Sequence, residues 1–480
     1  MLSVLGGIQR GRPPGKKEAL PNIVLRNMRN LYNILYISSL LMAWSGTGTG
    51  ATIMASGCSA VQVQSAINSA VSGDTVQVKA GSATWRSPVV IQNKSITLQG
   101  AGIGNTDITR NTTSNSDAAL TVDITPGHVV TISGFTFSTI NLAQWGIVNF
   151  VGEYGGGAPS GAQFRLTNCL INIAPSNPTI GTRGIHAIGI YGLIDHCTFS
   201  NTSANGQGLS VDAPNQWGVV TVRPTYMTPQ PLGTQDFVVV EDCTFNFSGG
   251  AADGACDAYC GTKIVFRHNT VNGTNVGWHG ADSEATSCRA FEVYDNAFNN
   301  TGSSIYTAVR ARGGTGVVWG NTVTGNYDRF FILSAYRADP SYGGVPLGSA
   351  TDGNFSQAGY AKYYPLLDQV GRGSFPESTQ WPKESSYTQV QYEALDPVYQ
   401  WGNNFLGNTA PTCTVDLPFQ STQYIIEGAD YNDNTQKPGY VPLGYPHPLA
   451  TTPSPPQNLR LIPPKQIPSN SARKRQSPRN

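Results

Sequence analysis

A short pattern of alternating apolar and polar residues recurs along the chain, and each copy closes on a small or amide residue. Within a copy the apolar residues alternate with period two, as a half-buried strand requires. Internal self-similarity decides the fold class before any local motif does. The copies read ITLQGAGI (96–103), VTISGFTF (130–137), FRLTNCLI (164–171), LIDHCTF (193–199), VVVEDCTF (238–245), IVFRHNTV (264–271), FEVYDNAF (291–298) and VVWGNTV (317–323).

The small or amide residue gives each copy a register mark, and most marks lie 25 to 34 residues apart. Just before a mark the alternation shifts by one residue, as at His268, Asp295 and Gly320. Such a shift moves the following side chains to the other face, so it predicts a bend. Two strands joined by a tight bend, repeated at this period, predict a solenoid. The marks are Ala101, Phe135, Cys169, Cys197, Cys243, Asn269, Asn296, Asn321 and Asn403.

Composition agrees with a turn-rich all-β protein, because charged residues make up 12% of the chain and 54 of 480 residues are Gly. One segment fits an amphipathic helix instead. Apolar residues recur with helical spacing over 59–73, and Gly73 suits the carboxyl-terminal cap. We therefore expect one short helix ahead of the coils.

The helix, the following SGDTVQVKAGSATW (72–85) and ITLQGAGIG (96–104), and the repeated bends resemble the pectin lyase-like superfamily over 57–449. The resemblance implies a right-handed parallel β-helix of about ten coils, capped by the helix. It also implies that Asn269, Asn296 and Asn321 stack at the bend. Substrates of the family are polysaccharides, often with uronate units, bound beside one parallel sheet. Its lyases use Ca²⁺ and a basic residue, whereas the acidic set of its hydrolases is not recognisable here.

The segment VRARGG (309–314) is the first candidate for catalysis. Alternation places Arg310 and Arg312 on one strand face, where two guanidinium groups need acids or a carboxylated substrate. His186 lies at the same offset from its register mark as Arg310. We take these three residues as catalytic candidates; the alternative is a pair of surface arginines in local ion pairs and a histidine that only packs.

Two turn segments on adjacent coils concentrate acidic and basic residues. Carboxylates are ligands for Ca²⁺, which takes six to eight oxygens. The alternative is a hydrogen-bonded rim without metal. The metal-ligand candidates are Asp253, Asp257, Asp282 and Glu284, and the substrate-binding candidates are Trp278, His279 and Arg289.

The cysteines and one long gap between register marks give two further predictions for the coils. Eight cysteines in an exported chain suggest disulfides. Cys169, Cys197 and Cys243 share the register mark and either form one bridge or stack as buried thiols. A bridge is expected among Cys256, Cys260 and Cys288. The period breaks between Asn321 and Asn403, which predicts an insertion at 327–401.

The termini differ from the body. Residues 1–50 fit a signal peptide with a miscalled leader, because the apolar run at 31–44 is short for a bilayer and small residues follow it. A retained membrane anchor is the alternative. Residues 450–480 form a Pro- and Ser-rich basic tail, expected to be disordered. Residues 31–456 then carry a net charge of −10, which disfavours nucleic acid as a partner.

Together these features predict a secreted or cell-surface, carbohydrate-active protein. The leading hypothesis is a polysaccharide lyase that cleaves an acidic, uronate-containing polysaccharide by β-elimination, with Ca²⁺ as a cofactor. The alternative is a non-catalytic extracellular protein that binds glycans or serves as a rigid scaffold. Fold cannot choose between the two, because function depends on the site that the fold carries.

Overall fold

The computed structural model divides the chain into two compact units, 1–48 and 49–480. The residues that it describes all belong to the second unit. They are 50–152, 162–173, 181–202, 206–212, 232–248, 254–258, 261–280, 288–334, 370–374, 394–407, 413–418, 421–423 and 425–451.

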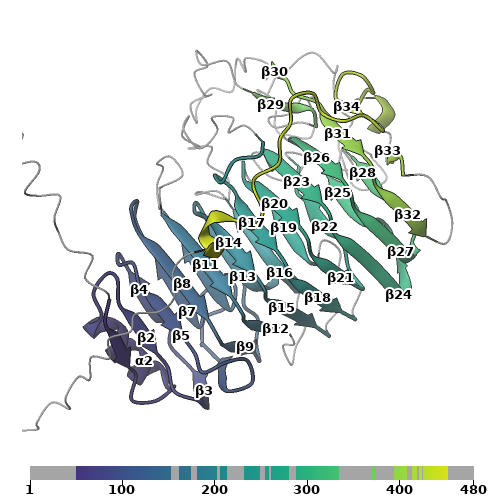
Figure 1. Ribbon diagram of the computed structural model, residues 1–480. Helices are drawn as coiled ribbons and strands as arrows, with labels where there is room; N and C mark the ends of the chain where they lie inside the picture. The colour runs from purple at the N-terminus through teal and green to yellow at the C-terminus, as the bar shows by residue number, and fades with distance from the viewer. Residues whose placement is uncertain are drawn as a thin grey trace, which may run out of the picture. The chain divides into compact units, whose positions relative to one another are not determined.

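Three parallel sheets form the second unit, and each coil adds one strand to each sheet in turn (Figure 1). Ten complete coils run from β2–β3–β4 to β31–β32–β33, which confirms the predicted right-handed parallel β-helix and its size. Sheet A contains β1 (Thr52–Met54), β2 (Thr75–Gln77), β5 (Thr97–Gln99), β8 (Val129–Ser133), β11 (Gln163–Thr167), β14 (Tyr191–Asp195), β17 (Val238–Glu241), β20 (Lys263–Arg267), β23 (Ala290–Tyr294), β26 (Thr315–Trp319), β31 (Val398–Trp401) and β34 (Tyr431–Asn432).

Sheets B and C contribute ten strands each. Sheet B contains β3 (Gly81–Trp85), β6 (Thr106–Arg110), β9 (Thr136–Thr139), β12 (Leu170–Ile173), β15 (Thr198–Asn201), β18 (Thr244–Phe247), β21 (Thr270–Asn272), β24 (Ala297–Ile305), β27 (Thr322–Tyr327) and β32 (Asn404–Gly407). Sheet C contains β4 (Val89–Gln92), β7 (Leu120–Asp123), β10 (Val148–Val151), β13 (Thr182–Ile188), β16 (Gly206–Asp212), β19 (Cys256–Ala258), β22 (Val276–Trp278), β25 (Val309–Ala311), β28 (Phe331–Leu333) and β33 (Val415–Asp416).

The expected insertion at 327–401 includes two coil strands. β28 continues sheet C and β31 continues sheet A, with Trp401 paired to Trp319. The interruption of the coil therefore lies between these strands, where β29 (Arg372–Ser374) and β30 (Ala394–Leu395) form a small antiparallel pair.

The predicted capping helix is present but shorter than expected. Helix α2 spans Ala60–Ser69 and buries Val63, Ala66 and Ile67. Gln62 Oε1 accepts hydrogen bonds from the backbone N–H and the hydroxyl of Ser59, which fixes the start. The helix ends at Ala70, whose backbone is extended, and Gly73 instead takes a positive φ in the turn before β2. No helix in the described part of the chain is long and apolar enough to cross a membrane.

The bend between sheets A and B has the same backbone conformation in successive coils. The residue before the register mark takes a left-handed conformation, with φ between 51° and 54° where it is not Gly. This turn explains the one-residue shift in the alternation, because it redirects the chain without adding a strand residue. The bend residues are Gly134, Asn168, His196, Asp242, His268, Asp295, Gly320 and Gly402.

The asparagines after this bend form the predicted ladder. The amide nitrogen of Asn269 donates to Asn296 Oδ1 (3.1 Å), and that of Asn296 donates to Asn321 Oδ1 (2.9 Å). Asn321 donates in the same way to Asn403 Oδ1 (3.0 Å). Each oxygen also accepts the backbone N–H of the preceding coil, as Asn296 Oδ1 does from Asn269 (2.9 Å). The ladder therefore satisfies buried backbone groups that would otherwise lack partners.

Thiols continue the ladder in the earlier coils. The Sγ of Cys243 points at the carbonyl of Ile194, and the Sγ of Cys197 points at that of Leu166. Burial raises the pKa of both the Cys169 and the Cys197 thiol, so these groups stay protonated weak donors. They stack without a bridge.

The expected disulfide among Cys256, Cys260 and Cys288 is wrong for the pair that can be checked. Cys256 and Cys288 are free thiols, and Cys260 lies outside the described residues. Both free thiols are buried in the apolar core, where cysteine packs as a small hydrophobe.

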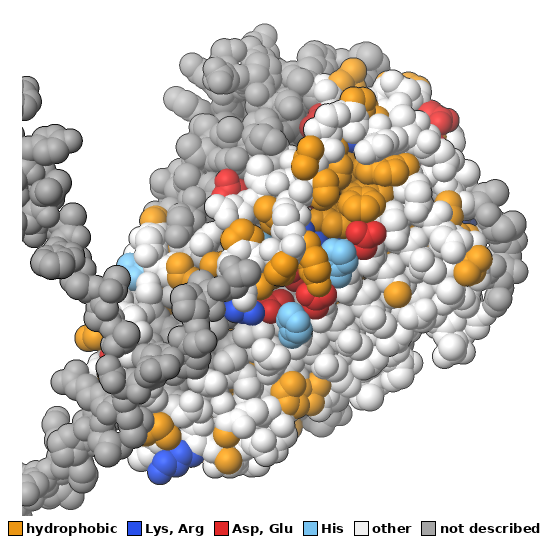
Figure 2. All heavy atoms as spheres, viewed as in Figure 1, with side chains coloured by type: hydrophobic (Ala, Val, Ile, Leu, Met, Phe, Trp, Pro, Cys, Tyr) orange, Lys and Arg blue, Asp and Glu red, His pale blue; other side chains and the backbone are white. Residues whose placement is uncertain are grey.

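The C-terminal segment (Lys437–Thr451) lies across the outer face of sheet A (Figures 1 and 2). Arg267 donates to the carbonyls of Leu443 (2.6 Å) and Gly444 (3.1 Å). Arg267 also pairs with Glu241, whose other oxygen accepts the backbone N–H of His447 (2.9 Å). Charged groups of sheet A are therefore buried with partners that come from the far end of the chain.

We expect Asn296→Leu to destabilise the second unit by about 1–3 kcal/mol, because it removes the acceptor and donors that serve buried backbone groups. The free energy of unfolding in urea measures this. Asn299→Leu is the matched control, since Asn299 is half-buried on the outer face of sheet B and its replacement should change stability little. An unfolding free energy that is equal in both variants would contradict the ladder.

His447 makes stability depend on pH. Burial, with the charge of Arg267, lowers its pKa from 6.5 to about 4. The imidazole of the unfolded chain is protonated near pH 6.5, whereas that of the folded chain is protonated only near pH 4. The contribution of His447 to the free energy of unfolding is therefore complete above pH 6.5. It is lost as the pH falls toward 4, by about 3 kcal/mol at most.

Urea unfolding at pH 7 and pH 4.5 tests this effect. The loss on acidification should shrink in His447→Gln, whose amide oxygen can still accept the N–H of Leu449 that Nδ1 accepts here. His128→Gln, at a half-buried histidine, should behave as wild type. Equal acid losses in wild type and His447→Gln would refute the assignment.

Candidate functional site

The outer face of sheet C brings several predicted site residues into one column. Its parallel register aligns His186 with Ser210, Ser210 with Asp257, Asp257 with Gly277, and Gly277 with Arg310. Neighbouring parallel strands lie ~4.8 Å apart, so Asp257 and Arg310 are separated by ~10 Å along the stack. The equal offsets of His186 and Arg310 in the sequence therefore correspond to one column in space.

Two histidine–carboxylate pairs occupy this face. His279 Nδ1 lies 2.8 Å from Asp257 Oδ1, and His186 Nε2 contacts Asp212 Oδ2. A carboxylate only accepts, so each neutral imidazole holds its proton toward its acid and has its lone pair on the opposite nitrogen. For His279 that nitrogen is Nε2, and 19% of the side chain is exposed. His186 and Asp212 have no exposed side-chain surface.

Further polar side chains hold the His279–Asp257 pair in place. Gln207 Nε2 donates to Asp257 Oδ2 (2.7 Å), so both carboxylate oxygens are engaged. Arg183 donates to the carbonyl of Gln144 (2.6 Å) and approaches Gln207 Oε1 (3.4 Å). This network fixes the carboxylate, which in turn fixes the imidazole ring.

Several buried polar atoms on this face have no hydrogen-bond partner in the described structure. They are Asn149 Oδ1, His186 Nδ1, Ser210 Oγ and Asp212 Oδ1. A buried unsatisfied group costs about 1–3 kcal/mol, so such groups are rare without a reason. Asn149, His186 and Ser210 belong to one column on adjacent strands.

The two predicted arginines lie at the far end of the same face. Arg310 is half-buried on β25, and Arg312 follows the strand with its Nε donating to the carbonyl of Trp278 (3.3 Å). Gly277 stands between Asp257 and Arg310, so no side chain separates the carboxylate from the guanidinium along the column. Gly277 holds the register position one coil before Arg310, and Glu284, which follows β22 in the sequence, lies outside the described residues.

Trp278 and Arg289 do not join this face. Trp278 is fully buried, and its ring packs against Phe291 in the core (5.3 Å between centroids). Strand alternation explains this, because Gly277 and His279 face outward and the residue between them must face inward. Arg289 lies directly before β23, a strand of sheet A, and is 1% exposed. Neither is placed where a substrate on sheet C would touch it.

Of the expected Ca²⁺ ligands, only Asp257 can be placed, since Asp253, Asp282 and Glu284 lie outside the described residues. Both oxygens of Asp257 already accept N–H groups, from His279 and Gln207. The described residues contain no group of three or more His, Cys, Asp or Glu that could hold a metal ion. The other three expected ligands would decide whether Ca²⁺ binds, so the metal site stays a prediction.

Sequence reasoning missed Asp212, Gln207 and Arg183. Arg183 lies on β13, three residues before His186, and Gln207 and Asp212 lie on β16. A long connection, from 213 to 237, separates β16 from the next strand of sheet A. Offsets counted back from the mark at Cys243 therefore miss β16. The alternating run GQGLSVD (206–212) was the available signal, because its period of two marks a strand without reference to any mark.

Comparisons with known proteins extend no further than architecture. No protein-family model matches the chain, and no curated protein matches it. An alginate lyase from Paenibacillus sp. str. FPU-7 matches with 14% identity and a TM-score of 0.31, covering 66% of this chain and 96% of that one. ORF18 of Geobacillus virus E2 matches with 14% identity and a TM-score of 0.26, covering 66% of this chain and 61% of that one. Likenesses at this level carry no argument about activity.

Proposed function

We propose that the chain is an extracellular polysaccharide lyase of the pectin lyase-like type. It cleaves an acidic, uronate-containing polysaccharide by β-elimination on the outer face of sheet C. One observation carries this proposal: the accessible His279–Asp257 pair lies beside Gly277 and Arg310, with no side chain between acid and guanidinium.

Charge supports an acidic substrate. The described residues of this face include three guanidinium groups, of Arg183, Arg310 and Arg312, and four carboxylates, of Asp123, Asp212, Asp257 and Asp416. The guanidinium groups of Arg310 and Arg312 lie two residues apart at β25, so positive charge is concentrated there and not over the whole face. Local charge of one sign concentrates ligands of the opposite sign.

His279 is the general base in this proposal. Its Nδ1–H is held by Asp257, so Nε2 is the nitrogen that takes the proton α to the uronate carboxyl group in this proposal. The carbon–hydrogen electrons form the new double bond to the β carbon. The bond from that carbon to the glycosidic oxygen breaks, and the oxygen leaves as a hydroxyl after taking a proton from water or a protonated side chain.

Arg310 binds the carboxylate during this step. Removing the α proton places negative charge on the carboxyl group, and a planar guanidinium can meet both oxygens of that group at once. His186 and its partner Asp212 lie earlier on the face, and neither has exposed side-chain surface, so neither is given a role in binding the sugar chain. Trp145 packs edge-on to His186 (5.7 Å between centroids) and holds it in place.

Ca²⁺ remains a proposal that rests on the family resemblance alone. Lyases with Ca²⁺ use it to bind and polarise the substrate carboxylate. Since the placed residue Asp257 is already engaged, no step above requires the ion. The activity assays therefore need parallel samples with added Ca²⁺ and with a chelator.

We expect His279→Ala to lower the rate of unsaturated uronate formation by about 100-fold or more, because general-base catalysis contributes at least this much. Ultraviolet absorbance of the products from a panel of uronate polysaccharides measures the rate. His128→Ala, at a half-buried histidine just before β8, is the matched control and should keep wild-type activity. Absence of product from every polymer, with Ca²⁺ and with chelator, would sink the lyase and favour the non-catalytic glycan-binding alternative.

We expect Arg310→Ala to weaken binding of the same acidic polysaccharide about tenfold, or roughly 1.4 kcal/mol. Arg310→Lys should recover part of this loss, because the charge remains while the two-point contact is lost. Arg86→Ala removes the same charge from an exposed turn and should bind as wild type. Titration calorimetry gives the affinities, and equal affinity of wild type and Arg310→Ala would remove the role of Arg310.

A further inference from the structure

The outer face of sheet B differs in kind from the other two faces. Its outward positions from β9 to β27 are half-buried or exposed, whereas Glu241 and Arg267 on sheet A and His186 on sheet C are fully buried. In Figure 2 the surface over these strands is mostly white, which marks side chains that are neither charged nor apolar. Sheet B therefore offers the open face of the described coils.

None of the outward positions in this stretch is charged. One column holds Thr136, Leu170, Thr198, Thr244, Thr270, Ala297 and Thr322, and the other holds Ser138, Asn172, Ser200, Asn246, Asn272, Asn299 and Thr324. Charged residues make up 12% of the chain, so this face is less charged than the chain as a whole.

The second column forms a hydrogen-bonded amide ladder in its later coils. Asn272 Nδ2 donates to Asn246 Oδ1 (2.8 Å), and Asn299 Nδ2 donates to Asn272 Oδ1 (3.2 Å). The hydroxyl of Thr324 donates to Asn299 Oδ1 (2.8 Å). Each amide nitrogen has two N–H groups, so one direction of every rung remains available to a ligand, at a repeat of ~4.8 Å.

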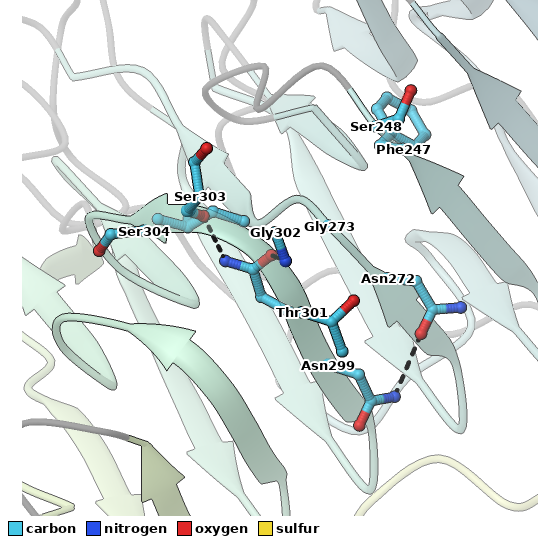
Figure 3. Close-up of a pocket in the computed structure, with 11 residues that line it drawn as sticks. Phe247, Ser248, Asn272, Gly273, Asn299, Thr301, Gly302, Ser303 and Ser304 are labelled. Carbon is cyan, nitrogen blue, oxygen red and sulfur yellow. Dashed lines mark hydrogen bonds between the residues drawn. The ribbon is translucent and has the colours of Figure 1, made fainter.

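A pocket of about 420 Å³ opens on this ladder (Figure 3). Its lining includes Asn272, Asn299, Thr301 and Ser303, with Phe247 at one side. This volume is within the range of about 300–1,000 Å³ that small-ligand sites occupy. No Asp, Glu, Lys or Arg belongs to the lining; Asp328 contacts it through the hydroxyl of Ser304.

One wall of the pocket is built by an irregularity in β24. The pairing of β24 with β27 shifts between Asn300 and Ile305, so that Thr301–Ser304 project as an exposed segment. Asn300 fixes this segment, since its Nδ2 donates to the carbonyls of Ser303 (2.8 Å) and Asn326 (2.7 Å) and its Oδ1 accepts from Gly302 (3.0 Å). The wall is therefore formed before a ligand arrives.

We propose that this pocket and the adjoining amide ladder bind a neutral polysaccharide chain, at a site separate from sheet C. Sugar hydroxyls donate and accept, and the rungs present matching amide and hydroxyl groups at a regular spacing. A carboxylated chain would find no cation here to offset the loss of its hydration.

Affinity electrophoresis tests the site with the full chain. Native gels contain galactomannan, hydroxyethyl cellulose or xyloglucan as neutral probes, and alginate or polygalacturonate as acidic ones. Wild type should be retarded by at least one neutral polysaccharide. Asn272→Asp and Asn299→Asp keep the side-chain shape and add a negative charge, so each should weaken that retardation at least tenfold.

Asn172→Asp is the matched control, because it adds the same charge to the same column three strands before Asn272. It should be retarded as wild type is, and unchanged melting midpoints confirm that all three variants fold. Absence of wild-type retardation in every neutral gel would overturn the proposal. The proposal would also be overturned if both pocket variants were retarded as strongly as wild type. The same holds if Asn172→Asp lost as much retardation as the pocket variants. These readings use neutral gels, so they stand whether or not the acidic polymers are cleaved.

Discussion

The buried bend between sheets A and B sets the geometry of the whole coil stack. A chain that turns inside a core must leave backbone N–H and C=O groups without strand partners, and such groups cannot stay unpaired away from water. A left-handed residue makes the turn, and the next side chain supplies the missing partners. Asn296 alone serves the backbone of Asn269, Phe266 and Tyr294. Every later strand inherits its register from this repeated contact.

That register explains why chemistry can collect on sheet C. Once consecutive coils are locked, residues at equivalent places in distant parts of the sequence stack at one strand spacing. Asp257 and His279 come from neighbouring coils, and Gln207 comes from the coil before them. The dyad is positioned by strands rather than by loops, and strands hold catalytic geometry more precisely. Gly277 has no side chain, and any side chain at this position would lie between Asp257 and Arg310.

The fold was predictable from sequence because its signal is repeated. A period of two, a shift at the bend and a fixed mark recur in each coil, so a local error at one copy is corrected by the others. The site depends on single positions and was predicted less evenly. His186, Asp257, His279, Arg310 and Arg312 were placed near one another by counting offsets. Trp278 was wrongly predicted to bind substrate. It lies next to His279 in the sequence, but strand alternation points its ring into the core.

Counting offsets also failed wherever connections vary in length. Asp212 and Gln207 lie on a strand whose distance to the next mark is set by a long connection, so the mark gives no information about them. The disulfide among Cys256, Cys260 and Cys288 was expected from spacing and export, yet Cys256 and Cys288 pack as separate buried thiols. Spacing places two residues on adjacent coils, but the direction of each side chain decides whether they can bond.

The three outer faces answer different physical demands, and the contrast limits what each can bind. The charged side chains of sheet A have their partners within the molecule, since Arg267, Glu241 and Glu292 are buried under the C-terminal segment. Burial raises the pKa of Glu292, although Tyr440 donates a hydrogen bond to it. Sheet C keeps the guanidinium groups of Arg310 and Arg312 near the half-buried imidazole of His279. The outward positions of sheet B from β9 to β27 carry no charge, so hydrogen bonds are the polar interaction available there. The two proposed sites therefore lie on different sheets and differ in charge, which is why one is proposed for an acidic polymer and the other for a neutral one.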